Sequence, residues 1–295
     1  IETIPDENLM KTLSNIRGKG RDDYPVRAMW NSLLAGVIFE HRSCESLRRE
    51  LARNGQLREL CGFGVFGKVP SKSAYNRFLQ NLLNHPKEIE KIFDQLVKDL
   101  IELLPDYGAN LAIDGKCLQS FAQKEGTKPE DRRGDHDANW GVKKQKGVRK
   151  DGTPWEKMTK WFGYRLHLIS DTKYELPVHF KVTKASCSEV KIAHILVEEL
   201  SQKHPTLMER AHYLMADKGY DSTKLIQELW EKYRVKPVID IRCMWKDGEK
   251  SQILDHNRVN NVCYDQKGTV TCHCPLTGEE REMRYKGFEK KTRDA

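Results

Sequence analysis

The chain has 295 residues, which is enough for one large or two ordinary domains, and its formal net charge is +8. An excess of basic residues favours a polyanionic partner such as nucleic acid, although many proteins of similar charge bind none. No apolar run approaches the roughly 20 residues that span a bilayer, and no signal-peptide pattern opens the chain. The composition therefore predicts a soluble, cytoplasmic protein and excludes an integral membrane protein.

The cysteines indicate a reducing environment. Five of the eight stand singly in apolar or helical surroundings, which suits free thiols better than a disulfide framework. These are Cys44, Cys61, Cys117, Cys187 and Cys243.

Residues 1–104 are predicted to form a small helical domain. Residues 1–23 are polar and contain Gly18 and Gly20, which predicts a loop. Helical periodicity or capping signals then predict four helices, separated after the second by a glycine-rich break. The predicted helices cover residues 26–38, 45–60, 72–83 (capped by Pro70-Ser71) and 86–104.

The exposed faces of these helices are basic. Short helices with a basic, serine-capped member resemble the helix-turn-helix way of binding DNA. We therefore expect Lys72 and Arg77, on the third helix, to contact DNA. The alternative is a solvated face of a structural bundle.

After a hinge at residues 105–108, two short apolar runs each end on an aspartate. Asp114 follows residues 110–113, and Asp217 follows residues 213–216. A nearly all-apolar strand is buried on both faces of its sheet, so a charge appears where the strand leaves the core, which is where such sheets bind ligands. Two neighbouring carboxylates there could hold Mg²⁺, and a pair of such ions can support displacement at phosphorus. The alternative is that both aspartates are turn residues or helix caps.

The segments around these runs predict an α/β domain. Residues 121–154 are charged and aperiodic, and they predict a loop that orders on DNA or a mobile solvated loop, with Asp135-His136-Asp137 and Trp140 as possible substrate-side residues. Further strands are expected at residues 161–169, 176–182 and 236–241. Helices are expected at residues 188–204 and 222–233, and the first of them leads directly into the Asp217 strand. The predicted order is therefore strand, strand, strand, helix, strand, helix, strand. This order is the ribonuclease-H-like plan, which places the first and fourth strands side by side.

Several motifs in order resemble the insertion-sequence DDE transposases. Residues 162–171, Leu176-Pro177, Val182-Thr183 and residues 216–221 resemble the catalytic core of that family. Residues 25–83, with Glu45-Ser46-Leu47-Arg48 and Pro70-Ser71, are similar to its amino-terminal domain. The resemblance covers most of residues 25–242. It implies a DNA-binding helical domain over residues 1–104, a ribonuclease-H-like α/β core over residues 105–242, and part of a β-rich insertion over residues 243–295.

The resemblance also implies a chemistry. Asp114 and Asp217 match the first two acids of the catalytic triad, which would bind two Mg²⁺ or Mn²⁺ ions for DNA cleavage and strand transfer at element ends. Lys218 and Arg165 could neutralise phosphates and Tyr220 could stack on a displaced base. The alternatives are a solvated turn residue, a strand-surface charge and a core residue, respectively. The implied partners are double-stranded DNA, as terminal inverted repeats and target, and a second copy of the chain, at the nucleoid.

The third acid is where the sequence departs from the family. The family has a glutamate in the pattern Tyr, two residues, Arg, three residues, Glu, six residues, Lys, and neither Tyr264 nor Tyr285 starts that pattern. We therefore expect the chain to stop inside the insertion, before the third acid, and to be inactive alone. A transposase-derived DNA-binding protein without catalysis, or a nuclease of the same fold, remain the alternatives.

One cysteine cluster in residues 243–295 has metal-ligand chemistry. Cys263, Cys272, His273 and Cys274 could bind Zn²⁺ through thiolate and imidazole groups. Their spacing is not that of a standard paired knuckle, and ordinary strand cysteines are the favoured interpretation.

Overall fold

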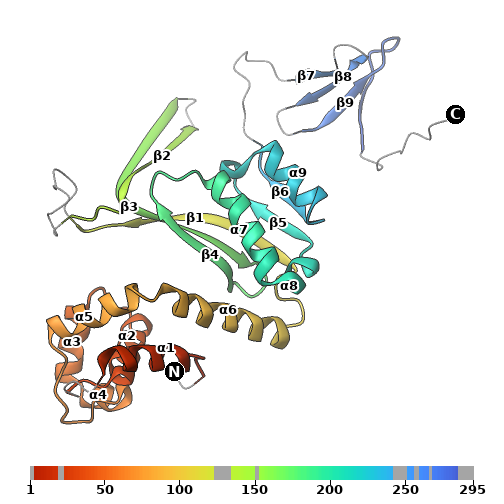
Figure 1. Cartoon of the computed structure of the whole chain (residues 1–295). Coiled ribbons are helices and arrows are strands. Elements are labelled where there is room, and N and C mark those ends of the chain that lie inside the picture. Colours follow the sequence, from red (N-terminus) through yellow and green to blue (C-terminus); the bar gives the residue numbers. More distant parts are fainter. Residues whose placement is uncertain are drawn as a thin grey trace. The chain divides into compact units, whose positions relative to one another are not determined.

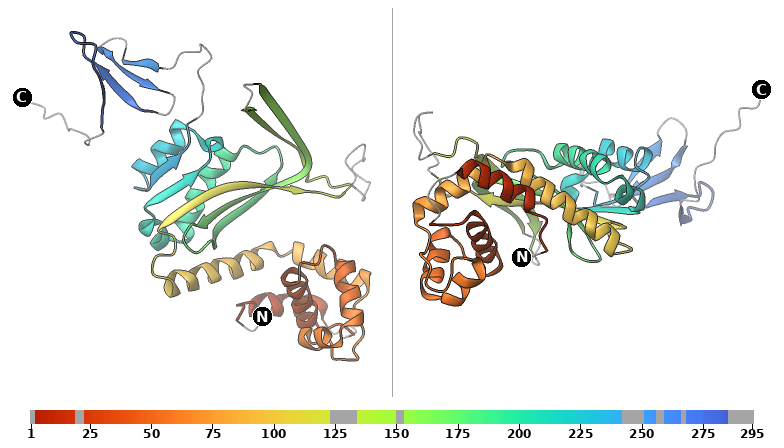
Figure 2. Two further views of the ribbon diagram at one scale, coloured as in Figure 1. Left: turned by 180° about the vertical axis from the view of Figure 1, so that it is seen from behind. Right: turned by 60° about the horizontal axis from the view of Figure 1, so that its bottom comes forward.

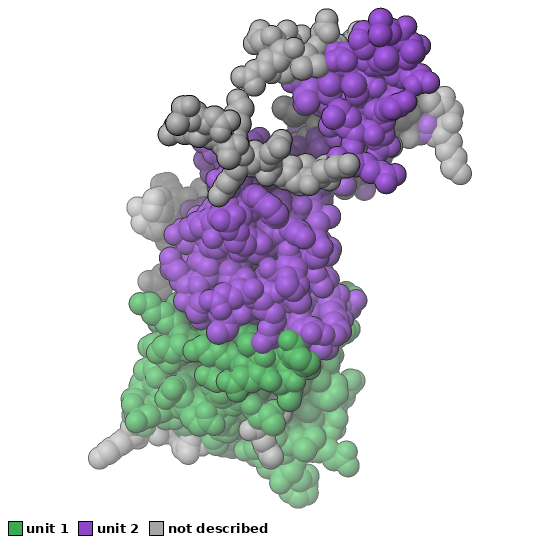
Figure 3. Space-filling model, turned by 90° about the vertical axis from the view of Figure 1, so that its right-hand side faces the viewer, with its two compact units in different colours: residues 1–105 green, residues 106–295 purple. Residues whose placement is uncertain are grey.

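The computed structural model describes residues 3–18, 23–122, 134–149, 153–241, 251–255, 259–265 and 268–284. The chain divides into two compact units, residues 1–105 and residues 106–295, which are coloured separately in Figure 3. Among the described residues, no helix is long and apolar enough to cross a membrane.

The first unit is helical throughout its described elements (Figure 1). The hydroxyl groups of Ser32 and Tyr75 lie 2.7 Å apart inside its core, so the buried phenol has a hydrogen-bond partner. Ser71 accepts a hydrogen bond from the Ala74 backbone N–H at 3.1 Å, which confirms the predicted cap. The helices are α1 (Glu7–Arg17), α2 (Val26–Ile38), α3 (Cys44–Arg53), α4 (Gly55–Cys61), α5 (Lys72–Leu83) and α6 (Pro86–Leu103).

Two predictions for this unit were wrong. Residues 1–23 are not simply a loop, because Leu9 and Leu13 are spaced one helical turn apart and bury the inner face of α1. The single helix expected over residues 45–60 is two helices. Asn54 interrupts it with an extended backbone, and its side chain accepts a hydrogen bond from the Leu57 N–H at 3.0 Å, which starts α4.

The second unit is built on a mixed sheet. Strands β1 (Asn110–Gln119), β5 (Tyr213–Ala216) and β6 (Lys236–Ile239) are parallel, and β3 (Pro154–Asp171) lies antiparallel between β1 and β4 (Pro177–Lys184). The spatial order β4-β3-β1-β5-β6 is the ribonuclease-H-like order expected from the sequence. Helix α7 (Glu189–Lys203) packs on β3 and β4, and α9 (Thr223–Glu231) packs beside β6 (Figure 1).

Three details of this sheet differ from the prediction. Strand β1 does not stop at Asp114, because its pairing with β3 continues to Gln119. A short helix, α8 (Pro205–Arg210), separates α7 from β5. Part of the predicted loop over residues 121–154 is strand β2 (Asn139–Val148), which pairs with the first half of β3 and forms the long hairpin visible in Figure 2.

The last described strands form a separate antiparallel sheet in the order β10-β9-β8-β7. Gly268 and Gly278 have positive φ angles at its turns, a conformation that glycine adopts without steric cost. Cys243 lies outside the described residues. The strands are β7 (Ser251–Asp255), β8 (Val259–Asp265), β9 (Val270–His273) and β10 (Glu280–Glu282).

Candidate active site

The parallel register between β1 and β5 brings Asp114 and Asp217 together. Ile113 lies opposite Ala216, so the next residue on each strand is an aspartate at the same level of the sheet. Both side chains are exposed. Strand β5 ends here although β1 continues, so the two carboxylates stand where the parallel pairing ends.

Each of these aspartates is held by a glycine. The Gly115 N–H donates to Asp114 Oδ1 at 2.7 Å, and the Gly219 N–H donates to Asp217 Oδ1, also at 2.7 Å. Asp217 thereby caps the short 3₁₀ turn Lys218–Tyr220. These backbone contacts fix the orientation of both carboxylates on a rigid sheet.

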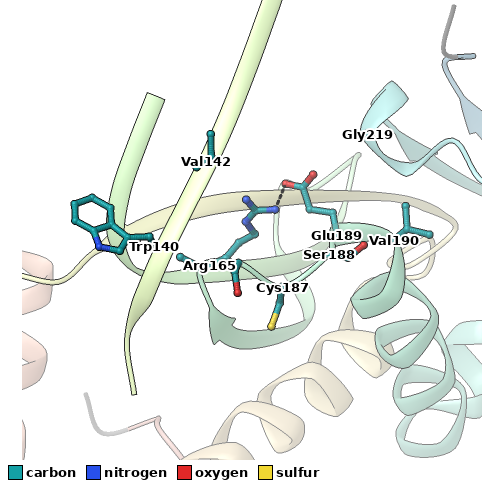
Figure 4. A pocket seen from close by; sticks show the side chains of 10 residues that line it. Trp140, Val142, Arg165, Cys187, Ser188, Glu189, Val190 and Gly219 are labelled. Atoms are coloured by element: carbon teal, nitrogen blue, oxygen red, sulfur yellow. Dashed lines mark ion pairs between the residues drawn. The ribbon is translucent and has the colours of Figure 1, made fainter. Parts of the chain in front are cut away.

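Glu189, which the sequence reasoning missed, is the acid that the fold adds. It is the first residue of α7, and its Oε1 pairs with Arg165 Nη1 at 2.9 Å (Figure 4). A Cβ added to Gly115 would lie 2.8 Å from Glu189 Oε1, and one added to Gly219 would lie 3.3 Å from Glu189 Oε2. Only the tertiary fold places this residue here, so nothing in its local sequence signals it.

Asp240 was also missed, although its pattern was visible. Ile239 on β6 lies opposite Ala216, so Asp240 follows β6 at the level of Asp217. The run Val238-Ile239-Asp240 is a third apolar run that ends on an acid, and this repeat of the pattern is the signal that could have identified it. Asp240 is exposed.

Arg165 and Tyr220 are less accessible than their predicted DNA contacts require. Arg165 is 9% exposed, and its guanidinium lies 5.2 Å from the centre of the Trp161 ring. Tyr220 is 1% exposed, so the prediction that it stacks on a displaced base was wrong, because the turn after Asp217 directs its ring into the core. Burial raises the pKa of Tyr220 well above its usual value, and the nearby negative charges of Glu189, Asp114 and Asp217 raise it further.

The other predicted DNA contacts are on the surface. Lys218 is exposed in the turn beside Asp217. Lys72 and Arg77 are exposed on α5 of the first unit. All three remain predictions, since exposure alone does not distinguish a DNA contact from a solvated charge.

His167 is a structural neighbour of the site. It is buried on β3 opposite Gly115, and its Nε2 lies 3.0 Å from Thr183 Oγ1. Burial, assisted by the positive charge of Arg165, lowers its pKa to about 4. The ring is therefore neutral at neutral pH, as suits the sheet residue expected from the sequence.

A hollow of about 470 Å³ adjoins the site (Figure 4). Figure 4 shows the Arg165–Glu189 ion pair between Trp140 of β2 on one side and the segment carrying Gly219 on the other. The hollow is lined by Trp140, Val142, Arg165, residues 185–190 and Gly219.

Strand β2 and the first half of β3 form a basic hairpin with an exposed aromatic residue. Trp140 is 48% exposed and packs edge-on against Phe162, with 5.7 Å between ring centres. Among the hairpin side chains whose burial is described, Lys143, Lys144, Lys157 and Lys160 are exposed. The hairpin has the composition of a surface that binds nucleic acid.

Asp135 stabilises the base of this hairpin. Its carboxylate accepts hydrogen bonds from Ser120 Oγ at 2.8 Å and from the Tyr164 hydroxyl at 2.6 Å. Burial alone would raise its pKa, but these hydrogen bonds lower the pKa below its usual value. Asp135 thus has a structural role at the base of the hairpin, whereas the sequence suggested a role near the substrate.

The zinc site that the sequence left as the less favoured possibility is not formed by the described residues. Cys263 on β8 lies opposite Thr271, whereas Cys272 lies opposite Val262, so these two thiols point to different faces of the sheet. His273 pairs with Glu280 at 3.4 Å. Within the described ranges, no three histidine, cysteine or acidic side chains are grouped so that they could hold a metal ion. By the same finding, no third described histidine, cysteine or acidic side chain completes a metal-binding group with Asp114 and Asp217.

Two family models match the chain. The model of the transposase DDE domain matches residues 111–291, and the model of a transposase domain (DUF772) matches residues 2–81. A search of curated proteins finds no significant match. A cryo-EM structure of a piggyBac transposase synaptic complex with hairpin DNA aligns with 13% identity and a TM-score of 0.41, over 95% of this chain and 57% of that chain.

The DDE-domain match spans nearly all of the sheet that holds Asp114 and Asp217 and more than half of the chain. The DUF772 match covers most of the helical unit. The chain belongs to the family of transposases with a DDE domain.

Proposed function

We propose that the chain cleaves DNA and transfers strands at the ends of an insertion sequence, with Asp114 and Asp217 as the ligands of Mg²⁺ or Mn²⁺, in contrast to the expectation, drawn from the absent Tyr-Arg-Glu-Lys pattern, that it is inactive alone. The observation that carries this proposal is the parallel register of Ile113 with Ala216, which brings the two carboxylates to one level of the sheet. Hard oxygen ligands on a rigid scaffold suit these ions. The buried Tyr220 hydroxyl, which has no hydrogen-bond partner within the described structure, also suits a site that binds a hydrated ion.

The chemistry would be positioning and charge neutralisation. When bound, the ions lower the pKa of an attacking water or 3′-hydroxyl and neutralise the leaving oxygen. The carboxylate oxygens of Asp114 and Asp217, which would be the metal ligands, are held in fixed places because each carboxylate accepts a hydrogen bond from a glycine N–H. Lys218, exposed in the turn beside Asp217, would neutralise a phosphate of the cleaved strand. Such a contribution suits phosphoryl transfer, where the transition state is loose.

The DNA would be held by basic surfaces in both units. The β2–β3 hairpin offers exposed Lys143, Lys144, Lys157 and Lys160 together with Trp140, and its base adjoins the hollow beside Gly219. Helix α5 offers Lys72 and Arg77. Joining two element ends requires two such sites, so the working form would be a homodimer on DNA.

The proposal is tested by nicking of supercoiled plasmid by the full chain with Mn²⁺ or Mg²⁺. Asp114→Asn and Asp217→Asn should each abolish nicking, because an amide does not supply a charged ligand. Both variants should still bind a fluorescently labelled duplex, with an affinity that falls as salt rises. Asp99→Asn, an exposed aspartate on α6, is the matched control and should nick as the wild type does.

Two outcomes would contradict the proposal. A wild-type chain that binds the duplex but never nicks plasmid with either ion would agree with the expectation that the chain is inactive alone, or with a DNA-binding protein without catalysis. Variants that nick at the wild-type rate would show that Asp114 and Asp217 do not hold the metal. A chain that nicks but never joins a labelled 3′-end to plasmid would be a nuclease and not a transposase.

A further inference from the structure

We propose that Glu189 is a third carboxylate of the Asp114–Asp217 metal site, supplied by the amino-terminal end of α7. The inference rests on the proposed function, since it assigns a further ligand to the same site. Glu189 lies between β4 and β5, on the first helix after the antiparallel strands.

The position of the Glu189 carboxylate relative to two glycines supports this assignment. Gly115 directly follows Asp114, and Gly219 donates its N–H to Asp217. A Cβ on Gly115 would lie 2.8 Å from Glu189 Oε1, and a Cβ on Gly219 would lie 3.3 Å from Glu189 Oε2. The Glu189 carboxylate thus lies close to both chain segments that anchor the two aspartates.

Asp217 and Glu189 approach the same small space. A Cβ on Gly219 would lie 2.6 Å from Asp217 Oδ1 as well as 3.3 Å from Glu189 Oε2. Two carboxylates at one unsubstituted glycine repel each other unless a cation lies near them. Arg165 supplies that positive charge here, through its 2.9 Å contact with Glu189 Oε1.

Helix α7 holds Glu189 on a rigid base. The inner face of the helix is buried against the sheet, with Ile192 8%, Leu196 0% and Leu200 0% exposed. Glu189 lies in the first turn, where the helix dipole favours a negative charge. The backbone is therefore fixed while the side chain keeps its rotatable bonds.

Tyr220 is an independent sign that a ligand belongs at this place. Its side chain is 1% exposed, and its hydroxyl has no hydrogen-bond partner among the described residues. The charges that act on this hydroxyl include those of Glu189, Asp114 and Asp217. A buried, unpaired hydroxyl costs free energy, and a water bound to a metal ion among these three acids would satisfy it.

Asp240 is the competing candidate for a third ligand. It stands at the level of Asp217 on the far side from β1, because β5 lies between β1 and β6. Glu189 is favoured because its two oxygens approach the segments of both aspartates, whereas the register places Asp240 beside Asp217 alone.

The test is Mn²⁺ binding by the full chain without DNA, measured from the electron paramagnetic resonance signal of free Mn²⁺. Glu189→Gln alone leaves Arg165 buried without its partner, which lowers stability. The informative comparison is therefore Arg165→Gln against the double variant Arg165→Gln/Glu189→Gln, since both lack the ion pair and differ only in the carboxylate. Thermal unfolding without metal checks that each variant is folded.

We expect the double variant to bind Mn²⁺ at least about tenfold more weakly than Arg165→Gln. Arg165→Gln should bind at least as tightly as the wild type, because a neighbouring positive charge is removed. Glu198→Gln, on the exposed face of α7, should bind as the wild type does.

Three results would overturn the assignment of Glu189. Equal affinity of Arg165→Gln and the double variant would show that the carboxylate does not reach the metal. If Mn²⁺ binds both variants equally and more weakly than the wild type, the Arg165–Glu189 ion pair affects metal binding only by maintaining the local structure. Weakening by Asp240→Asn in place of the double variant would assign the third ligand to Asp240. If Asp114→Asn also binds Mn²⁺ normally, the failure lies in the proposed function itself.

Discussion

The two places where the sequence offers metal-ligand side chains have opposite outcomes in the fold. Asp114 and Asp217 are 103 residues apart and come together, whereas Cys263, Cys272, His273 and Cys274 lie within twelve residues and do not converge. The first pair lies on neighbouring parallel strands in register. The second set lies on antiparallel strands whose successive side chains alternate between faces.

The difference teaches that strand register outweighs proximity in sequence. Parallel neighbours place equivalent residues side by side at one edge of the sheet, so two apolar runs that each end on an acid converge. Consecutive residues of one strand diverge, so Cys272 and His273 cannot share a ligand sphere without a turn between them. A cluster of ligand types within one strand is therefore weaker evidence for a site than a pattern that recurs on distant strands.

The largest expected effect concerns the aspartate pair. Asp114→Asn and Asp217→Asn should each lower Mn²⁺-dependent nicking at least about a thousandfold, since each removes several kcal/mol of charge stabilisation. The double variant should be no slower than the slower single variant, because the two residues act as one unit. A double variant whose loss is the product of the single losses would show that the aspartates act independently.

A second effect concerns acid stability. Burial and Arg165 lower the pKa of His167 to about 4 in the folded chain, against an ordinary value of 6.5. The unfolded chain therefore binds more protons between those two pKa values. The stability that His167 contributes is present above about pH 6.5 and is lost as pH falls toward 4, on the order of 3 kcal/mol in total.

His167→Gln should flatten this acid limb, because the amide does not titrate and can still bond to Thr183. The measurement is the free energy of urea unfolding at pH 7 and at pH 4.5 for both proteins. His273→Gln, in the sheet of strands β7–β10, is the matched control, since that side chain is 37% exposed. An unchanged slope in His167→Gln would mean that the buried ring does not govern the acid limb.

Much of the fold follows from local signals. Helices α2, α5 and α6 were predicted from their apolar periodicity, and for α5 the Ser71 cap agrees with that periodicity. The sheet order was predicted because three successive strands are followed by a helix, a strand, a helix and a strand, which is the ribonuclease-H-like order of elements. Strand β2 was missed because its lysine-rich sequence has no apolar alternation, and pairing with β3 makes it a strand.

The site was less accessible to sequence reasoning than the fold. Asp114 and Asp217 were identifiable because each ends an apolar run, and Asp240 shows the same pattern. Glu189 was not identifiable, since only the packing of α7 on the sheet brings it to Gly115 and Gly219. Tyr220 was misjudged because the sequence does not show which way the turn after Asp217 directs its ring.

A third effect tests the close packing around the aspartates. In Gly219→Ala the added methyl group would lie 2.6 Å from Asp217 Oδ1, so the carboxylate must move. We expect nicking to fall about tenfold while the chain stays folded. Gly278→Ala in the sheet of strands β7–β10 meets no atom within 4 Å but has a φ of +70°, so it should cost about 1 kcal/mol of stability and leave nicking unchanged. Equal nicking by both variants would show that the position of Asp217 is not limiting.

The smallest expected effect concerns the cysteines of the sheet of strands β7–β10. Because Cys263 and Cys272 point to different faces of their sheet, Cys272→Ser and Cys274→Ser should change neither the metal content nor the unfolding temperature by more than a small amount. Elemental analysis of the purified chain should find less than one zinc per chain, and a zinc chelator should leave the unfolding curve unchanged. One tightly bound zinc that both serine variants lose would mean that side chains outside the described residues complete the site. Register would then not be what separates the two regions.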